Sequence, residues 1–115
     1  MPRNFADRLL DKIDEMQNPS CVGLDPRVNA IPVYIIKDAI KNTCDSSSKG
    51  LERLSVGDAL AATGEAIYLF NAQIIDKTFD IAGVYKPQMA FYEQYGSAGV
   101  RAFERTVNYA KSKAQ

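Results

Sequence analysis

The chain has 115 residues, with 14 basic and 14 acidic side chains and no histidine or tryptophan. A formal net charge of zero argues against a dedicated nucleic-acid-binding protein, because such proteins neutralise phosphates with a clustered excess of lysine and arginine. No apolar run reaches the roughly 18 residues that a membrane span requires, and the N-terminus lacks the apolar core of a signal peptide. These features predict a globular protein of the cytoplasm that binds neither nucleic acid nor membrane.

The numbers of cysteines and histidines limit the kinds of metal site and catalytic site that the chain can form. Two cysteines, Cys21 and Cys44, are too few for a disulfide framework. Cys21 lies within an apolar run and is predicted to be a small buried residue. Because the chain has no histidine, we expect no zinc site and no catalytic grouping of the Ser-His-Asp or Cys-His type.

The first half of the chain predicts a helix, a short strand and a mixed segment. Asn4 is a suitable N-cap, and apolar residues at helical spacing indicate an amphipathic helix over residues 5–17. The run "CVGL" at 21–24 is short, apolar and bounded by turn formers, as expected of a strand. A short helix is predicted after Pro32, and "CDSSSKG" at 44–50 is predicted to be a loop. The apolar face of the first helix consists of Phe5, Leu9, Ile13 and Met16.

The second half predicts a long helix, a second strand and a final helix. Apolar spacing indicates the long helix over about 57–77, and "AGVY" at 82–85 is the second strand candidate. Residues 88–95 are expected to form a loop or a single helical turn. Ser97 is predicted to cap the last helix, which has lysines near its C-terminus, where cations are favoured. The apolar face of that helix consists of Val100, Phe103, Val107 and Ala110.

This alternation of helices and strands is typical of a parallel α/β protein. Two parallel strands are too few for a finished sheet of this kind, because such strands are normally paired on both sides and covered on both faces. We therefore expect the strands either to pair with another chain or to be part of a larger domain. The pattern shows no internal repeat and no second domain within residues 1–115.

Both predicted strands end in the same way, at one charged residue followed by proline. "VGLDPR" places Asp25 before Pro26, and "GVYKPQ" places Lys86 before Pro87. A residue before proline is held extended, and the C-terminal ends of parallel strands are where α/β proteins bind ligands. Asp25 and Lys86 are therefore predicted to stand side by side on that edge, where they either orient each other for a polar substrate or form a salt bridge without further function.

Three segments together resemble a known enzyme family. "CVGLDPR", "FNAQIID" and "YKPQMAFYEQYGSAGVRAFERTVNYAK" occur in order and at plausible spacing. They are similar to orotidine 5′-phosphate decarboxylase, in the longer variety found in many bacteria and in malaria parasites. The resemblance extends from Phe5 to Lys111 and matches the N-terminal part of the family's sequence.

The resemblance implies a fold and an activity. The family is a (β/α)₈ TIM barrel, usually a homodimer, that converts orotidine monophosphate to uridine monophosphate and CO₂ in pyrimidine biosynthesis, which makes it a carbon-carbon lyase. It uses no metal and no cofactor. On this resemblance the chain is the N-terminal portion of an α/β barrel, with two parallel strands and their flanking helices.

Individual residues match the family's motif. Asp25 matches the aspartate after the first strand that hydrogen-bonds the ribose of the substrate. Lys86 matches the second-strand lysine of the family's charged array, which contacts ribose and holds a neighbouring aspartate, so the resemblance implies a catalytic and substrate-binding role. Three residues match the loop after that strand and are expected to support it rather than to act directly: Gln88, Phe91 and Tyr92. Asn71 and Gln73 match a helix motif with an expected structural role.

The chain also departs from the family pattern. The family's Asp-x-Lys-x-x-Asp motif, which supplies the proton-donating lysine, has no counterpart in the sequence. A whole barrel takes about 250 residues, so the chain is expected to be catalytically incomplete. Two alternatives stay open at this point: another sugar-phosphate barrel of the same superfamily, and a non-catalytic α/β module that binds a nucleotide or a partner through its sheet edge.

Overall fold

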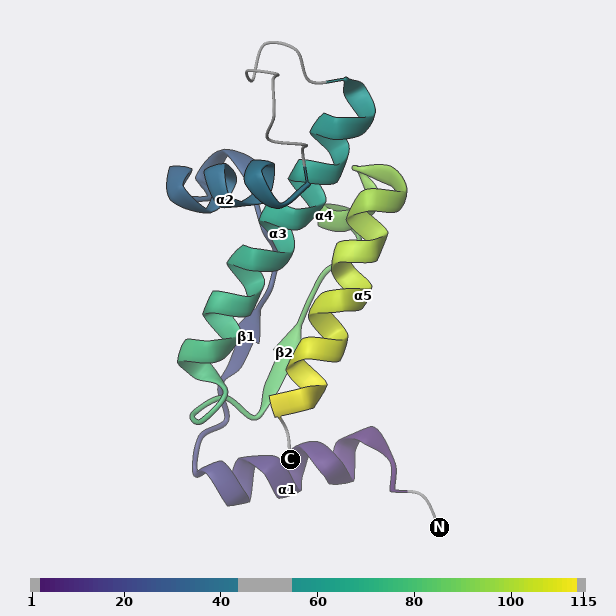
Figure 1. The fold of residues 1–115 in the computed structure, drawn as a ribbon. Helices are drawn as coiled ribbons and strands as arrows, with labels where there is room; N and C mark the ends of the chain where they lie inside the picture. Colours follow the sequence, from purple (N-terminus) through teal and green to yellow (C-terminus); the bar gives the residue numbers. More distant parts are fainter. Residues whose placement is uncertain (1–2, 44–54, 114–115) are drawn as a thin grey trace.

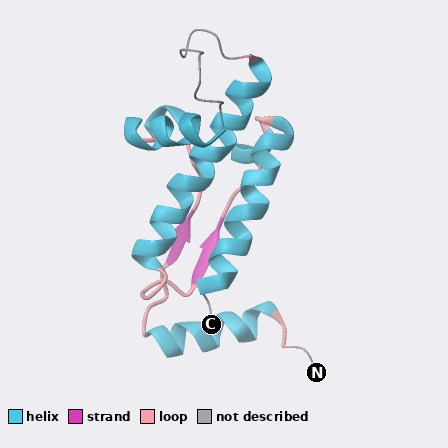
Figure 2. Cartoon of the chain, viewed as in Figure 1, coloured by secondary structure: helices cyan, strands magenta, loops and turns pink. Residues whose placement is uncertain are grey.

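A computed structural model of the chain describes residues 3–43 and 55–113 (Figure 1). The predicted loop at 44–50 and Cys44 lie outside the described residues. Helices dominate the described chain, and two short strands lie behind them (Figure 2). The elements in chain order are α1 (Phe5–Met16), β1 (Cys21–Gly23), the 3₁₀ helix η1 (Val28–Ala30), α2 (Val33–Thr43), α3 (Val56–Thr78), β2 (Val84–Lys86), α4 (Ala90–Glu93) and α5 (Gly96–Lys113).

The two strands are parallel neighbours, as the sequence predicts. Their connection runs through α2 and α3, which is the long crossover that parallel strands require. The second strand begins at Val84, two residues later than the apolar run at 82–85 indicates, and it ends at Lys86. The paired residues are Cys21 with Val84, Val22 with Tyr85, and Gly23 with Lys86.

The long helices α3 and α5 lie side by side over the strands, and α1 crosses beneath the N-terminal ends of the strands (Figure 1). Close packing of α3 on α5 depends on Gly64, where an added Cβ would lie 2.7 Å from the Ala98 carbonyl oxygen. The short helix α2 lies at the opposite end from α1, near the C-terminal ends of the strands.

Capping explains where the helices begin. The Asn4 side chain accepts a hydrogen bond from the Asp7 backbone N–H at 2.8 Å, which confirms the predicted N-cap. Ser97 is not a cap, because α5 begins at Gly96. The sequence pattern missed that start because Gly96 adopts φ 67°, a left-handed conformation that glycine takes without a steric penalty, and makes the turn after α4 one residue earlier.

The apolar core lies around the C-terminal ends of the strands, not on the strands themselves. Residues from η1, α2, α3, α4 and α5 meet there, and the strand residues themselves are exposed or half-buried. The core therefore holds the strand ends, and the region beyond them, in place. Its buried members are Ile31, Ile35, Ala39, Ala66, Ile67, Tyr92 and Ala102.

One expectation about burial is corrected by the structure. Cys21 is exposed, so the predicted burial of this residue is wrong. It is the first residue of β1, and within the described residues the sheet consists of β1 and β2 alone, so each strand has an unpaired edge. On the predicted apolar face of α1, Leu9, Ile13 and Met16 are half-buried, whereas Phe5 is 61% exposed.

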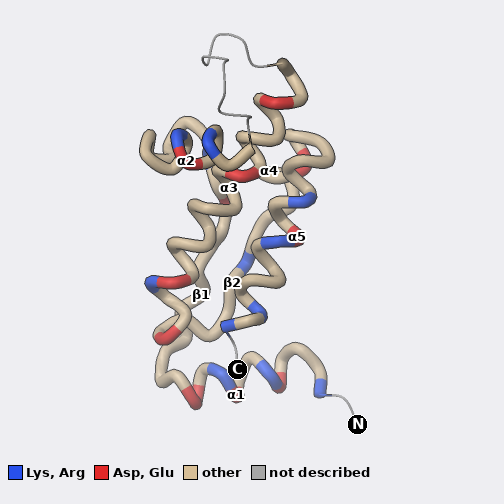
Figure 3. The backbone as a smooth tube through the Cα atoms, in the orientation of Figure 1, with Lys and Arg blue, Asp and Glu red and all other residues tan. Residues whose placement is uncertain are grey.

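Residues of both charge signs occur along the helices (Figure 3). This distribution agrees with the formal net charge of zero. None of the helices formed by residues 3–43 and 55–113 has the length and apolar character needed to cross a bilayer.

Candidate functional site

Asp25 and Lys86 meet at the C-terminal edge of the sheet, as the shared strand-then-proline pattern predicts. Lys86 is the last residue of β2, and Asp25 follows β1 after Leu24. Because the strands are parallel and in register, both side chains emerge at the same edge. The Lys86 Nζ atom lies 4.0 Å from Asp25 Oδ2.

The pair stays open to solvent. The Lys86 side chain is 62% exposed and the Asp25 side chain is 31% exposed. An exposed ion pair at this separation contributes little to stability, because water screens the attraction and two flexible side chains must be ordered. The arrangement thus places an acceptor and a donor of opposite charge beside each other, both partly exposed to solvent.

A backbone group orients the Asp25 carboxylate. The Gln88 N–H donates a hydrogen bond to Asp25 Oδ1 at 3.0 Å, while Oδ2 faces Lys86. The two carboxylate oxygens therefore have different partners, and rotation of the side chain would break one of the contacts. The segment after β2 holds Asp25 through its backbone, so the Gln88 side chain is not needed for this contact.

Phe91 lies beside the edge and packs against the apolar core. The Arg27 guanidinium carbon lies 6.0 Å from the centroid of the Phe91 ring, at the outer limit of a cation–π contact. Arg27 follows Asp25 and Pro26, so this contact ties the segment after β1 to the segment after β2. The loop role expected for Phe91 stays a prediction.

Tyr92 is fully buried and connects the core to the strand end. Its hydroxyl donates a hydrogen bond to the Leu24 carbonyl at 2.5 Å and accepts one from Asn71 Nδ2 at 3.0 Å. Burial, together with the nearby negative charge of Asp25, raises the pKa of Tyr92 to about 12. The hydroxyl is therefore protonated across the physiological pH range and remains a donor to Leu24.

The helix motif that contains Asn71 and Gln73 divides between the core and the surface. Asn71 is buried and also donates to Thr106 Oγ1 at 3.2 Å, whereas Gln73 accepts a hydrogen bond from the exposed Tyr34 hydroxyl at 2.8 Å. Thr106 was missed by the sequence analysis. The available signal was a hydroxyl residue on the inward face of the last helix, between Phe103 and Val107.

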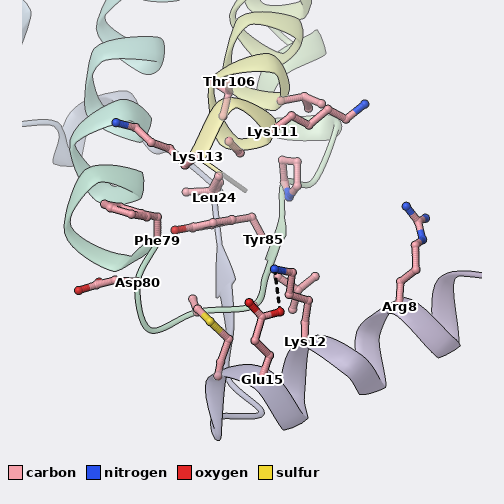
Figure 4. Close-up of a pocket in the computed structure, with 17 residues that line it drawn as sticks. Arg8, Lys12, Glu15, Leu24, Phe79, Asp80, Tyr85, Thr106, Lys111 and Lys113 are labelled. Atoms are coloured by element: carbon pink, nitrogen blue, oxygen red, sulfur yellow. Dashed lines mark ion pairs between the residues drawn. The ribbon is translucent and has the colours of Figure 1, made fainter. Parts of the chain in front are cut away.

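A cavity of about 510 Å³ lies between α1, β2 and the C-terminal half of α5, and its lining includes Leu24 and Pro87 beside the edge. Figure 4 shows Lys12 and Glu15 of α1, joined by an ion pair at 3.2 Å, on one side and Lys111 and Lys113 of α5 on the other. Asp25 and Lys86 do not line it. Within the described ranges, no three histidine, cysteine or acidic side chains gather in a way that could hold a metal ion.

Comparison with known proteins identifies one group of relatives. No protein-family model matches the chain. It is 32% identical to orotidine 5′-phosphate decarboxylase from Petrotoga mobilis over 108 residues, which is 94% of this chain and 30% of the relative. It is also 32% identical over 109 residues to the enzyme of the same name from Clostridium acetobutylicum, again 30% of the relative. The chain thus resembles these decarboxylases over nearly its whole length and spans about 30% of theirs.

A solved structure supports the same fold. The crystal structure of orotidine 5′-monophosphate decarboxylase from Plasmodium berghei superposes with a TM-score of 0.59 and 24% sequence identity. The match covers 96% of this chain and 41% of that one. The parallel strands and flanking helices are therefore part of an α/β barrel fold, as the sequence predicts.

Proposed function

We propose that this chain forms the first two strand–helix units of an orotidine 5′-phosphate decarboxylase, with Asp25 and Lys86 binding the ribose of the nucleotide. The observation that carries the proposal is the juxtaposition of these two side chains at the C-terminal edge of adjacent parallel strands. In a barrel, that edge is the working face. The similarity to curated decarboxylases over 94% of the chain supports this choice of reaction.

The chemistry of the pair suits a ribose ring. Asp25 can accept hydrogen bonds from sugar hydroxyls, and Lys86 can donate to a sugar oxygen while keeping the carboxylate in place. Groups that are fixed before the reaction begins stabilise a transition state without a cost of reorganisation at that moment. In the proposed site, Lys86 thus acts on the reacting nucleotide through its charge and position.

The chain is proposed to be one part of the catalytic unit. Decarboxylation leaves an electron pair on the pyrimidine ring, and a proton donor must neutralise it. The sequence has no histidine, and Lys86 is placed for the ribose. We therefore assign proton donation to the remaining part of the barrel, which also provides strands to pair with the open sheet edges. A homodimer, as the resemblance implies, belongs to the complete enzyme.

The experiment uses a chimera in which residues 1–115 replace the matching segment of the Petrotoga mobilis decarboxylase. Loss of orotidine monophosphate absorbance is followed for the chimera and for the isolated chain. We expect turnover by the chimera and none by the chain alone. Turnover by the chain that Lys86→Ala abolishes would contradict the proposed incompleteness. A folded chimera that binds orotidine monophosphate without converting it would favour a binding module.

A further inference from the structure

The backbone hydrogen bonds between β1 and β2 end at Leu24, next to Asp25 and Lys86. Beyond this point, side chains replace the expected backbone partners. The Leu24 N–H donates to the Lys86 carbonyl at 3.1 Å, which continues the parallel ladder beyond β1. In an evenly spaced parallel ladder, the Leu24 carbonyl would next accept from the Gln88 N–H. Instead, the Gln88 N–H donates to Asp25 Oδ1 at 3.0 Å, and the Leu24 carbonyl accepts from the Tyr92 hydroxyl at 2.5 Å.

Tyr92 thereby takes the place of a backbone donor. A buried carbonyl without a partner costs free energy, so without this hydroxyl the Leu24 carbonyl would compete with Asp25 for the Gln88 N–H. The hydroxyl leaves that N–H available to the carboxylate. Because Tyr92 is buried and Asp25 is partly exposed, the contact links the core to the open edge.

The donor role of Tyr92 is fixed by its neighbours. The single hydroxyl hydrogen of Thr106 is used on the Ala102 carbonyl at 2.7 Å, and that of Tyr92 is used on Leu24. Both hydroxyls therefore act as acceptors toward Asn71, whose amide group has two hydrogens to donate. In this arrangement Asn71 Oδ1 has no hydrogen-bond partner among the described residues.

We propose that Tyr92, held by Asn71 and Thr106, is a positioning residue that orients Asp25 toward the ribose by freeing the Gln88 N–H. The relay runs from α5 through α3 and α4 to the end of β1. Tyr92 itself does not touch the substrate. The identity of the substrate in this inference rests on the proposed function. The exchange of hydrogen-bond partners rests on the geometry alone.

The kinetic test is a double-mutant cycle in the chimera with Tyr92→Phe and Asp25→Ala. Tyr92→Phe is expected to raise KM for orotidine monophosphate about tenfold while kcat stays within about twofold, because a ground-state contact to the ribose is weakened. In the Asp25→Ala background the same substitution is expected to change KM by less than about twofold. A role in stability alone would change activity by the same factor in both backgrounds, and that result would overturn the proposal.

Tyr95→Phe is the matched control for loss of a hydroxyl. Tyr95 packs against the same core, and its hydroxyl makes no hydrogen bond within the described ranges. Its removal is expected to leave KM unchanged. An increase equal to that of Tyr92→Phe would show that the effect is not specific to the relay.

A structural readout separates this inference from the proposed function. In a crystal structure of the Tyr92→Phe chimera, the Gln88 nitrogen is expected within hydrogen-bond distance of the Leu24 carbonyl, with Asp25 Oδ1 released. If the Gln88 N–H still donates to Asp25 in that structure, the inference fails even when the chimera is active. If the chimera is inactive, the same structure still tests the exchange of hydrogen-bond partners. Gln88→Pro deletes the same N–H directly and serves if Tyr92→Phe does not fold. An unchanged KM in that variant, in a chimera whose Asp25→Ala variant raises KM, would also overturn the proposal.

Discussion

Asn71 and Gln73 show how two neighbouring polar residues of one motif serve different purposes. Asn71 is fully buried and donates two hydrogen bonds that join α3 to α4 and α5. Gln73 is exposed and contacts the Tyr34 hydroxyl at the surface. The burial of a residue, and not its polarity, therefore determines its contribution here.

This difference gives a test at the level of single residues. Asn71→Ala is expected to lower the free energy of unfolding by about 1–3 kcal/mol, because two hydroxyl acceptors lose their donor in the core. Gln73→Ala on the surface is expected to stay within about 0.5 kcal/mol. Urea denaturation of both chimera variants measures the difference, and equal losses would show that the buried network does not stabilise the fold.

Sequence reasoning found the residues of the edge but not the relay behind them. The proline after Asp25 and after Lys86 marks a strand end in the sequence itself, so their juxtaposition was predictable. The contact between Tyr92 and the Leu24 carbonyl spans 68 residues and involves a backbone group, which leaves no pattern in side-chain types. Thr106 was missed because its partner Asn71 lies 35 residues away on another helix.

The close packing of α5 against α4 depends on a glycine within the first turn of α5. An added Cβ at Gly99 would lie 1.7 Å from the Tyr92 carbonyl oxygen, a distance at which the backbone must shift. Gly57, in the first turn of α3, has only the Ser55 Oγ atom nearby, at 3.8 Å. The two glycines therefore permit a matched comparison of the same substitution in a crowded and in an open place.

Gly99→Ala is expected to destabilise the chimera by about 1–3 kcal/mol, the usual range for forcing extra volume into a packed site. Gly57→Ala is expected to be neutral or to stabilise by up to about 1 kcal/mol, because alanine favours the helix. Thermal unfolding of the two variants measures both effects. A neutral Gly99→Ala would mean that α4 and α5 do not approach this closely.

The C-terminal halves of α3 and α5 are joined by a charged cluster. Asp76 on α3 accepts a hydrogen bond from the Tyr109 hydroxyl and lies 3.5 Å from Lys113 Nζ. The Tyr109 hydrogen bond holds the pKa of Asp76 below its ordinary value of 3.8. The same bond raises the pKa of Tyr109 above its ordinary value of 10.0, and Tyr109 raises the pKa of Lys113 above 10.5.

These pKa shifts predict that the free energy of unfolding is highest at intermediate pH and falls at both acidic and basic pH. A lowered carboxyl pKa contributes stability above its ordinary value of 3.8, and this is lost as pH falls through the folded pKa of Asp76. The raised Tyr109 and Lys113 values contribute stability below 10.0 and 10.5, which is lost as pH rises through the folded pKa values. Tyr109→Phe is expected to reduce the loss of stability at acidic and at basic pH, measured as the urea midpoint at each pH. A pH dependence of the urea midpoint identical to that of the parent chimera would show that the Tyr109 hydrogen bond does not stabilise the fold.

Helix boundaries were predictable because their signals are local. The predicted first helix at 5–17 and long helix at 57–77 agree with α1 and α3 to within two residues. The start of α5 was missed because Gly96 places the turn before Ser97. The sequence pattern therefore succeeded at the capped starts of α1 and α3 and failed where a glycine forms the turn before α5.

At the scale of the whole molecule, the described chain leaves much apolar surface uncovered. Large apolar side chains such as Leu10 on α1 and Ile81 before β2 are more than half exposed. Apolar patches of this kind mark surfaces that other parts of a protein cover. The wrong prediction for Cys21 has this physical cause, because a residue's neighbours along the chain do not reveal which face stays open.

We propose that the Asp25–Lys86 edge binds the ribose of the nucleotide in a complete decarboxylase. Lys86→Ala and, as a matched control, Lys37→Ala on the exposed surface of α2 are compared in the chimera. Lys86→Ala is expected to lower kcat/KM by a factor on the order of 10²–10³, because a preorganised charge is lost. Lys37→Ala is expected to stay within about twofold. A Lys86→Ala enzyme within about threefold of the parent chimera would contradict the account.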